Sequence, residues 1–121
     1  MTGPEIVNIA GALVTMGMGC LGLLTPKMAS KLVRLGPTSP EGFAEFRATY
    51  GGLFVALGAA PLIWPEPGLF LVAGLAWMGA AVGRLVSMVA DETHLKFNSL
   101  SVVFECACAG LLLFGNSYLF A

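Results

Sequence analysis

The chain of 121 residues is 57% hydrophobic and only 11% charged, and its formal net charge is −1. Because soluble domains usually carry about 25% charged residues, this composition indicates an integral membrane protein and excludes an ordinary soluble domain. The small net charge and the scattered basic residues provide no basic face for nucleic acid, so we expect no nucleic-acid partner.

The first apolar run covers residues 6–24. Its length is close to the roughly 20 residues that a helix needs to cross the hydrocarbon layer of a membrane. It lacks a preceding basic segment and a convincing cleavage site, so we interpret it as a membrane span and not as a signal peptide. Thr25 and Pro26 end the run, and a proline suits the first position of a new helix.

The next segment, residues 26–35, predicts a short amphipathic helix in the membrane interface. Lys27, Lys31 and Arg34 recur at helical spacing, and apolar residues repeat on an adjacent face. Basic side chains in such helices contact anionic lipid headgroups. We favour a general anchor on the positively charged side of the membrane, and a lipid-specific site remains the alternative.

Three further apolar runs, about 43–64, 69–90 and 100–120, each predict a membrane-spanning helix. Ser39 and Pro40 are typical of the N-cap and the first residue of the second span. Turn residues separate the runs, and no long linker remains. The sequence therefore predicts one integral membrane domain over residues 1–121. We expect an all-α bundle of four transmembrane helices, with a short interfacial amphipathic helix after the first span.

The basic residues predict how this bundle is oriented. All six lysines and arginines lie in or near the first and third loops, and none lies in the second loop or in either tail. Loops that are rich in lysine and arginine stay on the cytoplasmic side. Both termini are therefore expected on the periplasmic side.

Three charged residues interrupt the apolar runs, namely Arg47, Arg84 and Glu105. A charge that faces lipid at mid-membrane costs about 2.5–3.5 kcal/mol, so we expect the three to meet one another. With a rise of 1.5 Å per residue, each lies roughly 8–10 Å from the cytoplasmic end of its helix. This predicts a polar layer at one height on three helices. Either arginine suits Glu105, because a guanidinium binds a carboxylate through two parallel hydrogen bonds.

Polar neighbours extend this layer to Tyr50, Ser87, Asn98 and Ser101, which follow helical spacing from the three charges. In one interpretation, the layer is a salt-bridged clasp that fixes the order and rotation of the helices. In the other, it binds an anionic or polar headgroup or carries protons, because ionisable residues inside a membrane usually have a function. The sequence leaves both interpretations open.

Small residues at helical spacing predict close helix packing. The candidates are Gly51 and Gly52 in the second span and Gly79 and Gly83 in the third. We expect mostly contacts within the chain. One such face can instead form a homo-oligomer or join a larger membrane complex.

Motifs that carry chemistry are absent from the sequence. His94 is the only histidine, and Cys106 and Cys108 point to nearly opposite faces of a helix, so we expect no metal and no cofactor. There is no nucleophile elbow, phosphate loop or dinucleotide fingerprint. We therefore expect a non-catalytic protein, and an enzyme that uses Glu105 as an acid–base group is the weakest alternative.

Three segments together resemble the signature of an uncharacterised family: residues 46–52 (FRATYGG), 83–87 (GRLVS) and 104–105 (FE). This family of small four-helix bacterial inner-membrane proteins has a domain of unknown function and is distantly similar to the DoxX-like group. The resemblance covers about residues 43–110. It implies the four-helix fold, a bacterial inner membrane, and a shared role for Arg47, Tyr50, Arg84 and Glu105. The family often has glycine after the acidic residue that follows the third span, whereas Glu92 stands there in this chain, so that turn is expected to differ.

Two functional hypotheses follow from these observations. The first is an accessory or scaffold subunit, surrounded by membrane lipids, that self-associates or joins a larger complex. The second is a small binder or carrier of a lipid, quinone or other amphipathic ligand at the cytoplasmic-side layer of arginine and glutamate. Partner subunits that co-purify would favour the first hypothesis, and a retained small ligand would favour the second.

Overall fold

The computed structural model describes residues 2–116 of the chain. Within this range the helices are α1 (Gly3–Leu24), α2 (Pro26–Val33), α3 (Pro40–Phe46), the π-helical segment η1 (Arg47–Gly52), α4 (Leu53–Ile63), α5 (Pro67–Ala90) and α6 (Leu95–Leu113). α3, η1 and α4 follow one another as one continuous helix. This helix, α1, α5 and α6 are each long and apolar enough to cross a membrane. The predicted all-α bundle of four transmembrane helices, with a short helix after the first, is confirmed.

The helices begin where the sequence provides capping residues. The Ser39 hydroxyl accepts a hydrogen bond from the Gly42 backbone nitrogen at 3.0 Å, and Pro40 is the first residue of α3, as predicted. Pro26 begins α2, which is also confirmed. The spanning helices start a few residues before the apolar runs, because capping and turn residues form their first turns. α6 ends at Leu113, and the predicted end of its span at residue 120 lies outside the described residues.

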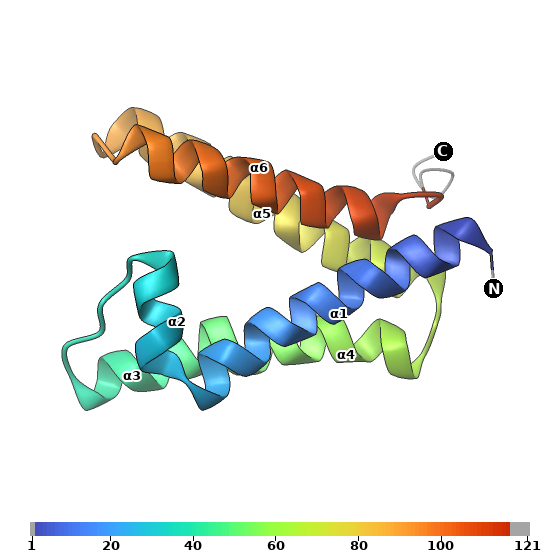
Figure 1. The fold of residues 1–121 in the computed structure, drawn as a ribbon, viewed down its shortest axis with the longest axis horizontal. Helices are drawn as coiled ribbons and strands as arrows, with labels where there is room; N and C mark the ends of the chain where they lie inside the picture. The colour runs from blue at the N-terminus through green and yellow to red at the C-terminus, as the bar shows by residue number, and fades with distance from the viewer. Residues whose placement is uncertain (1, 117–121) are drawn as a thin grey trace.

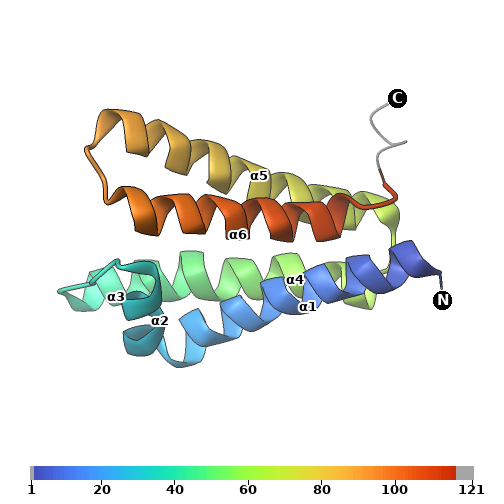
Figure 2. The ribbon, with the colours of Figure 1, turned by 45° about the horizontal axis from the view of Figure 1, so that its top comes forward.

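The helices form two pairs (Figures 1 and 2). α1 packs against η1 and α4, and α5 packs against α6. The two pairs approach each other near the start of α1 and the end of α6, and they diverge toward α2. We call the first region, around Asn8, Leu112 and Asn116, the closed end. We call the region beside α2, around Arg84 and Glu105, the open end.

α1 lies unusually close to the helix of η1 and α4. A Cβ atom at Gly58 would lie 2.5 Å from the Met16 backbone nitrogen, and a Cβ atom at Gly22 would collide with the Tyr50 carbonyl. No larger residue fits at either position without moving a backbone. Such small residues allow membrane helices to pack through their backbones.

A cluster of buried apolar residues lies toward the closed end. Leu112 is fully buried and belongs to a cluster that also includes Ala12, Phe70, Ala73, Trp77, Cys108 and Ala109. These residues come from α1, α5 and α6. They join the two helix pairs into one bundle, because α1 contacts both of the other helices here.

Two buried asparagines, Asn8 and Asn116, connect the helices at this end through hydrogen bonds. Asn8 Nδ2 donates to the carbonyl oxygens of Leu111, Leu112 and Phe114 at 2.8, 3.3 and 3.0 Å. Asn116 Nδ2 donates to Asn8 Oδ1 at 3.0 Å and to the Leu112 carbonyl at 3.0 Å. The last carbonyls of a helix have no partner within the helix. Asn8 therefore ties the start of α1 to the end of α6.

Large apolar side chains cover the outside of the bundle. The exposed fraction is 89% for Val89, 66% for Val103 and 55% for Val82. Soluble monomers rarely expose so many large apolar side chains, whereas lipid tails cover them readily. The described helices are thus consistent with a multi-pass membrane protein.

Candidate functional site

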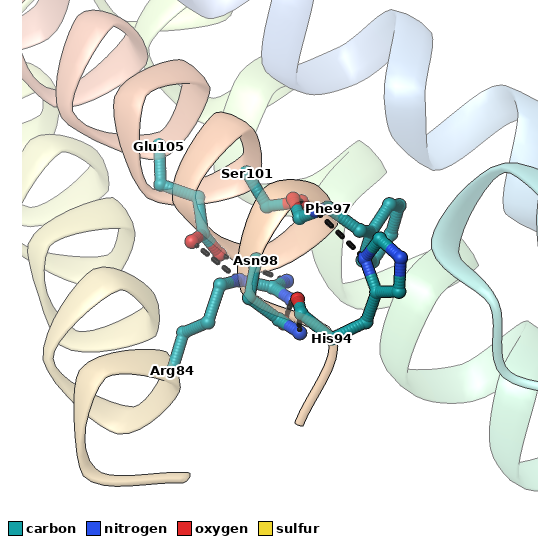
Figure 3. Close-up of polar contacts among 6 residues, drawn as sticks. All are labelled: Arg84, His94, Phe97, Asn98, Ser101 and Glu105. Atoms are coloured by element: carbon teal, nitrogen blue, oxygen red, sulfur yellow. Dashed lines mark hydrogen bonds and ion pairs between the residues drawn. The ribbon is translucent and has the colours of Figure 1, made fainter. Parts of the chain in front are cut away.

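The central contact of the site joins α5 to α6 through Arg84 and Glu105 (Figure 3). Arg84 Nε donates to Glu105 Oε1 at 2.8 Å, and Arg84 Nη2 donates to Glu105 Oε2 at 3.4 Å. The Glu105 side chain is 8% exposed, whereas that of Arg84 is 27% exposed. The pair neutralises a buried carboxylate through two contacts. Of the two arginines considered for this pair, the structure selects Arg84.

Asn98 completes this group from the beginning of α6. Its Oδ1 accepts from Arg84 Nη1 at 2.8 Å, and its Nδ2 donates to the His94 carbonyl at 2.8 Å. His94 is the N-cap of α6, and its Nδ1 accepts from the Phe97 backbone nitrogen at 3.1 Å (Figure 3). The start of α6 thus holds the Asn98 oxygen toward the guanidinium. We call Arg84, Asn98 and Glu105 the polar cluster.

The two predicted serines form hydrogen bonds along their own helices. Ser101 donates to the Phe97 carbonyl at 2.9 Å, one turn earlier in α6. Ser87 donates to Asp91 Oδ2 at 2.6 Å, where α5 ends. Ser101 lies beside the cavity described below. Ser87 thus contacts Asp91, the residue that ends its helix.

Arg47 does not join the polar cluster. It begins η1, and its Nη1 donates to the Leu23 carbonyl at the end of α1. A carbonyl in the last turn of a helix has no partner within that helix and is a ready acceptor. Equal depth in a membrane does not fix the direction in which a helical side chain points. The expected contact of Arg47 with Arg84 and Glu105 is therefore wrong.

A cavity of about 350 Å³ lies beside the polar cluster at the open end. Both helix pairs and α2 contribute to it, through residues such as Met18 of α1, Leu32 of α2 and Leu100 of α6. Arg84 and Glu105 are its only charged lining residues within the described range. The cavity is thus a largely apolar space that has one polar corner.

Five of the aromatic residues that line the cavity form a continuous row of rings. We call them the aromatic wall: Phe46, Tyr50, Phe54, Trp77 and Phe104. In this order, the centres of successive rings lie 4.9, 6.3, 5.3 and 5.8 Å apart. Aromatic rings attract one another at these separations. The wall therefore runs without a break from α3 to α6.

The sequence predicted Tyr50 as a site residue, but it did not predict that the five residues of the aromatic wall lie together. Phe46, Tyr50 and Phe54 recur every four residues, and this spacing was an available signal for a shared helix face. Trp77 joins the wall from another helix, and no spacing in the sequence indicates this. Its Nε1 donates to the buried Thr15 hydroxyl at 2.9 Å, which fixes the ring.

α2 lies next to the cavity and carries three basic residues. Lys27, Lys31 and Arg34 are all exposed. Arg34 ends the helix with a φ of 55°, and its guanidinium carbon lies 4.6 Å from the centre of the Phe97 ring. This cation–π contact links α2 to α6. Contact of these basic residues with lipid headgroups remains a prediction.

The four glycines predicted at helix contacts fall into two groups. A Cβ atom at Gly51 would lie 2.8 Å from the Leu23 Cα, so Gly51 is at a contact with α1. A Cβ atom at Gly52 would meet only the Arg47 carbonyl of its own helix, at 3.9 Å. A Cβ atom at Gly79 or Gly83 would meet no other helix of the described chain within 4 Å. The expectation that these two pack against another helix of the described chain is wrong, because their face of α5 points outward.

The chemistry available at the site is hydrogen-bond donation. A guanidinium carries five N–H groups, and Arg84 uses three of them, which leaves two without an acceptor among the described residues. Both oxygens of Glu105 already accept from Arg84. Within the described range, no group of three or more histidine, cysteine, aspartate or glutamate residues could hold a metal ion.

Comparison with known proteins identifies the family of the chain. The family model described as "Domain of unknown function (DUF4345)" matches residues 5–115. Because the match covers most of the sequence, the chain belongs to this family. The predicted membership of an uncharacterised family is confirmed. No curated protein and no solved structure matches the chain significantly.

Proposed function

We propose that the protein binds a small amphipathic molecule at the open end. Its polar head would meet the polar cluster, and its apolar part would lie along the aromatic wall. One observation carries this proposal: Arg84 and Glu105 are the only charged residues of the described chain that line a largely apolar cavity of about 350 Å³. Cavities that bind small molecules have volumes of about 300–1,000 Å³, are mostly apolar, and contain a few placed polar groups.

The position of the polar cluster argues against a purely structural clasp. Arg84 lies on α5, and Asn98 and Glu105 lie on α6. The short connection between Ala90 and Leu95 already holds these two helices together. None of the hydrogen bonds of the cluster reaches α1 or α4, so the cluster does not fasten one helix pair to the other. Burying these charges costs free energy, and a role in binding a ligand would explain why the protein keeps them.

The mass of the folded chain, as it is purified from membranes in mild detergent, tests this proposal. Native mass spectrometry of the wild type should show the chain with one small amphiphile bound. Ser101→Phe places a ring in the cavity and should release the amphiphile. Val103→Phe adds the same ring on the outer face, where Val103 is 66% exposed, and should retain it. A bare wild-type chain would contradict ligand binding, and equal retention in both variants would contradict binding in this cavity.

The proposed location is a bacterial inner membrane, with the open end toward the cytoplasm and both termini in the periplasm. The basic residues Lys27, Lys31 and Arg34 support this orientation, since positive charge collects on the cytoplasmic side. A phosphatase reporter that is fused after Ala121 should then be active. A fluorescent cytoplasmic reporter that is bright at the same position would contradict the orientation.

A second function, self-association or membership of a larger membrane complex, is favoured by the outward face of α5. Gly79 and Gly83 lie there, one helical turn apart, and a Cβ atom at either would meet no other helix of the described chain within 4 Å. Two small residues at this spacing allow another membrane helix to approach closely. An accessory subunit could use this face while the open end holds its ligand.

Gly83→Leu tests this second function, and Gly110→Leu is its matched control. A Cβ atom at Gly110 would likewise meet no neighbour within 4 Å among residues 2–116, but Gly110 lies on α6. Gly83→Leu should reduce the oligomer or complex that native mass spectrometry detects, and Gly110→Leu should leave it intact. Monomeric wild-type protein without co-purifying subunits would contradict self-association and complex membership.

A further inference from the structure

The charge balance of the cavity determines which polar heads it accepts. Arg84 carries one positive charge and Glu105 one negative charge, and the two are bound to each other through both carboxylate oxygens. Asn98 is uncharged. The remaining lining residues in the described range are also uncharged. The polar corner of the cavity therefore has no net charge.

An anionic head fits this corner poorly. It would have to approach Arg84 beside the Glu105 carboxylate or displace that carboxylate from the guanidinium. In the first case, two like charges would share a site of low dielectric constant. In the second, Glu105, which is 6% exposed, would become a buried charge without a partner. Both arrangements are costly.

A neutral oxygen acceptor meets neither obstacle. Arg84 keeps two N–H groups without an acceptor in the described part of the chain, as the three contacts of its guanidinium show. A carbonyl oxygen accepts from these groups without disturbing Glu105. The polar corner is thus suited to heads that accept hydrogen bonds and carry no charge.

The aromatic wall adds a preference for shape. Phe54 and Trp77 meet edge to face, and so do Trp77 and Phe104, with ring planes at 67° and 85°. A flat aromatic-type ring binds most favourably beside such rings. The reason is that aromatic rings attract one another in addition to the stabilisation that comes from burying apolar area. The same wall includes Phe104, only one residue before Glu105.

We propose, on the basis of the proposed function, that the ligand is an electrically neutral amphiphile whose head is a flat ring bearing carbonyl-type oxygen acceptors. The ring lies on the aromatic wall, and an oxygen accepts from Arg84. The exposed cations of α2 do not change this preference, because Lys27, Lys31 and Arg34 are not part of the cavity lining. We expect them to contact lipid headgroups outside the cavity.

Trp77 provides a direct readout of binding. The chain has two tryptophans, and Trp64 is 61% exposed at the end of α4, so Trp64→Phe leaves Trp77 as the only fluorophore of its kind. Three probes are compared in nanodiscs of neutral lipid: decylubiquinone, which is neutral and ringed; dodecyl phosphate, which is anionic; and dodecanol, which is neutral and has no ring. Decylubiquinone should quench Trp77 saturably. Neither of the others should displace it at equal concentration.

Control variants separate specific binding from collisional quenching in the bilayer. Phe104→Leu removes a ring of the wall and should weaken decylubiquinone binding about three- to tenfold. Phe114→Leu removes a ring that is 54% exposed at the end of α6 and should leave binding unchanged. The double variant Arg84→Met/Glu105→Gln keeps the corner neutral and should lose about tenfold in affinity.

Glu105→Gln tests the charge argument alone. It leaves Arg84 uncompensated, so the affinity for dodecyl phosphate relative to that for decylubiquinone should rise about tenfold. Dodecyl phosphate or dodecanol that displaces decylubiquinone from the wild type would overturn the neutral-ring proposal and leave ligand binding intact. Quenching that never saturates, or that is equal in Phe104→Leu and Phe114→Leu, would also overturn it. Failure of ligand binding itself would appear separately, as a bare chain in native mass spectrometry.

Discussion

The polar groups at the closed end and at the open end of the bundle differ in how completely they are buried and hydrogen-bonded. At the closed end, both asparagines are buried, and Asn8 donates or accepts at four atoms of α6 and the residues after it. At the open end, Arg84 is partly exposed and keeps two N–H groups without an acceptor in the described chain. The first end is packed around the fully buried Leu112, and the second surrounds a cavity.

This difference supports the proposed function, in which one end of the bundle stabilises the fold and the other binds a ligand. Satisfied polar groups in a packed region stabilise a fold, because removing one partner leaves the others buried and unpaired. Partly satisfied groups beside a cavity contribute less to the fold and remain available to a ligand. Residues at the closed end should therefore control stability, and those at the open end should control binding.

The largest expected effect on stability is at Asn8. Asn8→Ala leaves the carbonyls of Leu111, Leu112 and Phe114 without their donor and should lower the free energy of unfolding by about 2–3 kcal/mol. Asn98→Ala at the open end is the matched control and should cost less than about 1 kcal/mol. Denaturant unfolding in detergent, followed by circular dichroism, measures both. Equal losses would remove the distinction between the two ends.

An intermediate effect is expected at the polar cluster. Arg84→Met leaves Glu105 buried without its cation and should destabilise the fold by about 1–2 kcal/mol, less than for a fully buried pair because Arg84 is 27% exposed. Adding Glu105→Gln removes the unpaired charge and should restore most of the loss. The same unfolding experiment checks this. A double variant that is as unstable as Arg84→Met would show that the pair itself holds the fold together.

The smallest effect is expected at α2. Arg34→Ala removes the cation–π contact with Phe97 and should lower the free energy of unfolding by only about 0.5–1 kcal/mol. Its control is Lys31→Ala on the same helix, which should change stability by less than about 0.5 kcal/mol. A loss at Arg34 that matches the loss at Asn8 would mean that α2 stabilises the bundle as strongly as the closed end does.

The sequence predicted the helices well because their signals are local. Ser39, Pro40 and Pro26 specify helix starts within a few residues, and a run of apolar residues specifies a span by its length alone. The pairing of Glu105 with an arginine was also predictable, since a buried carboxylate needs a cation nearby. The choice of Arg84 over Arg47 was not predictable, because the depth of a residue in the membrane does not specify how its helix is rotated about its axis.

Contacts between distant segments were the part that the sequence did not reveal. Asn8 and Asn116 are separated by 108 positions, and each stands alone in or beside an apolar run. The contacts of Trp77 with Phe54 and Phe104 likewise depend on how the two helix pairs are rotated relative to each other. The small-residue spacing of Gly79 and Gly83 predicts a helix contact without naming the helix. In this structure the partner of that face is not another helix of the described chain.

The most direct test of the division between the two ends is thermal unfolding before and after the bound amphiphile is extracted with detergent. A ligand that binds only the folded state stabilises it, by about 2.7 kcal/mol at a concentration of 100 times its dissociation constant. Extraction should therefore lower the Tm of the wild type and of Asn8→Ala by similar amounts, although Asn8→Ala starts lower. Ser101→Phe, whose cavity is filled, should not respond. A Tm that falls equally in Ser101→Phe, or that does not fall in the wild type, would contradict the account.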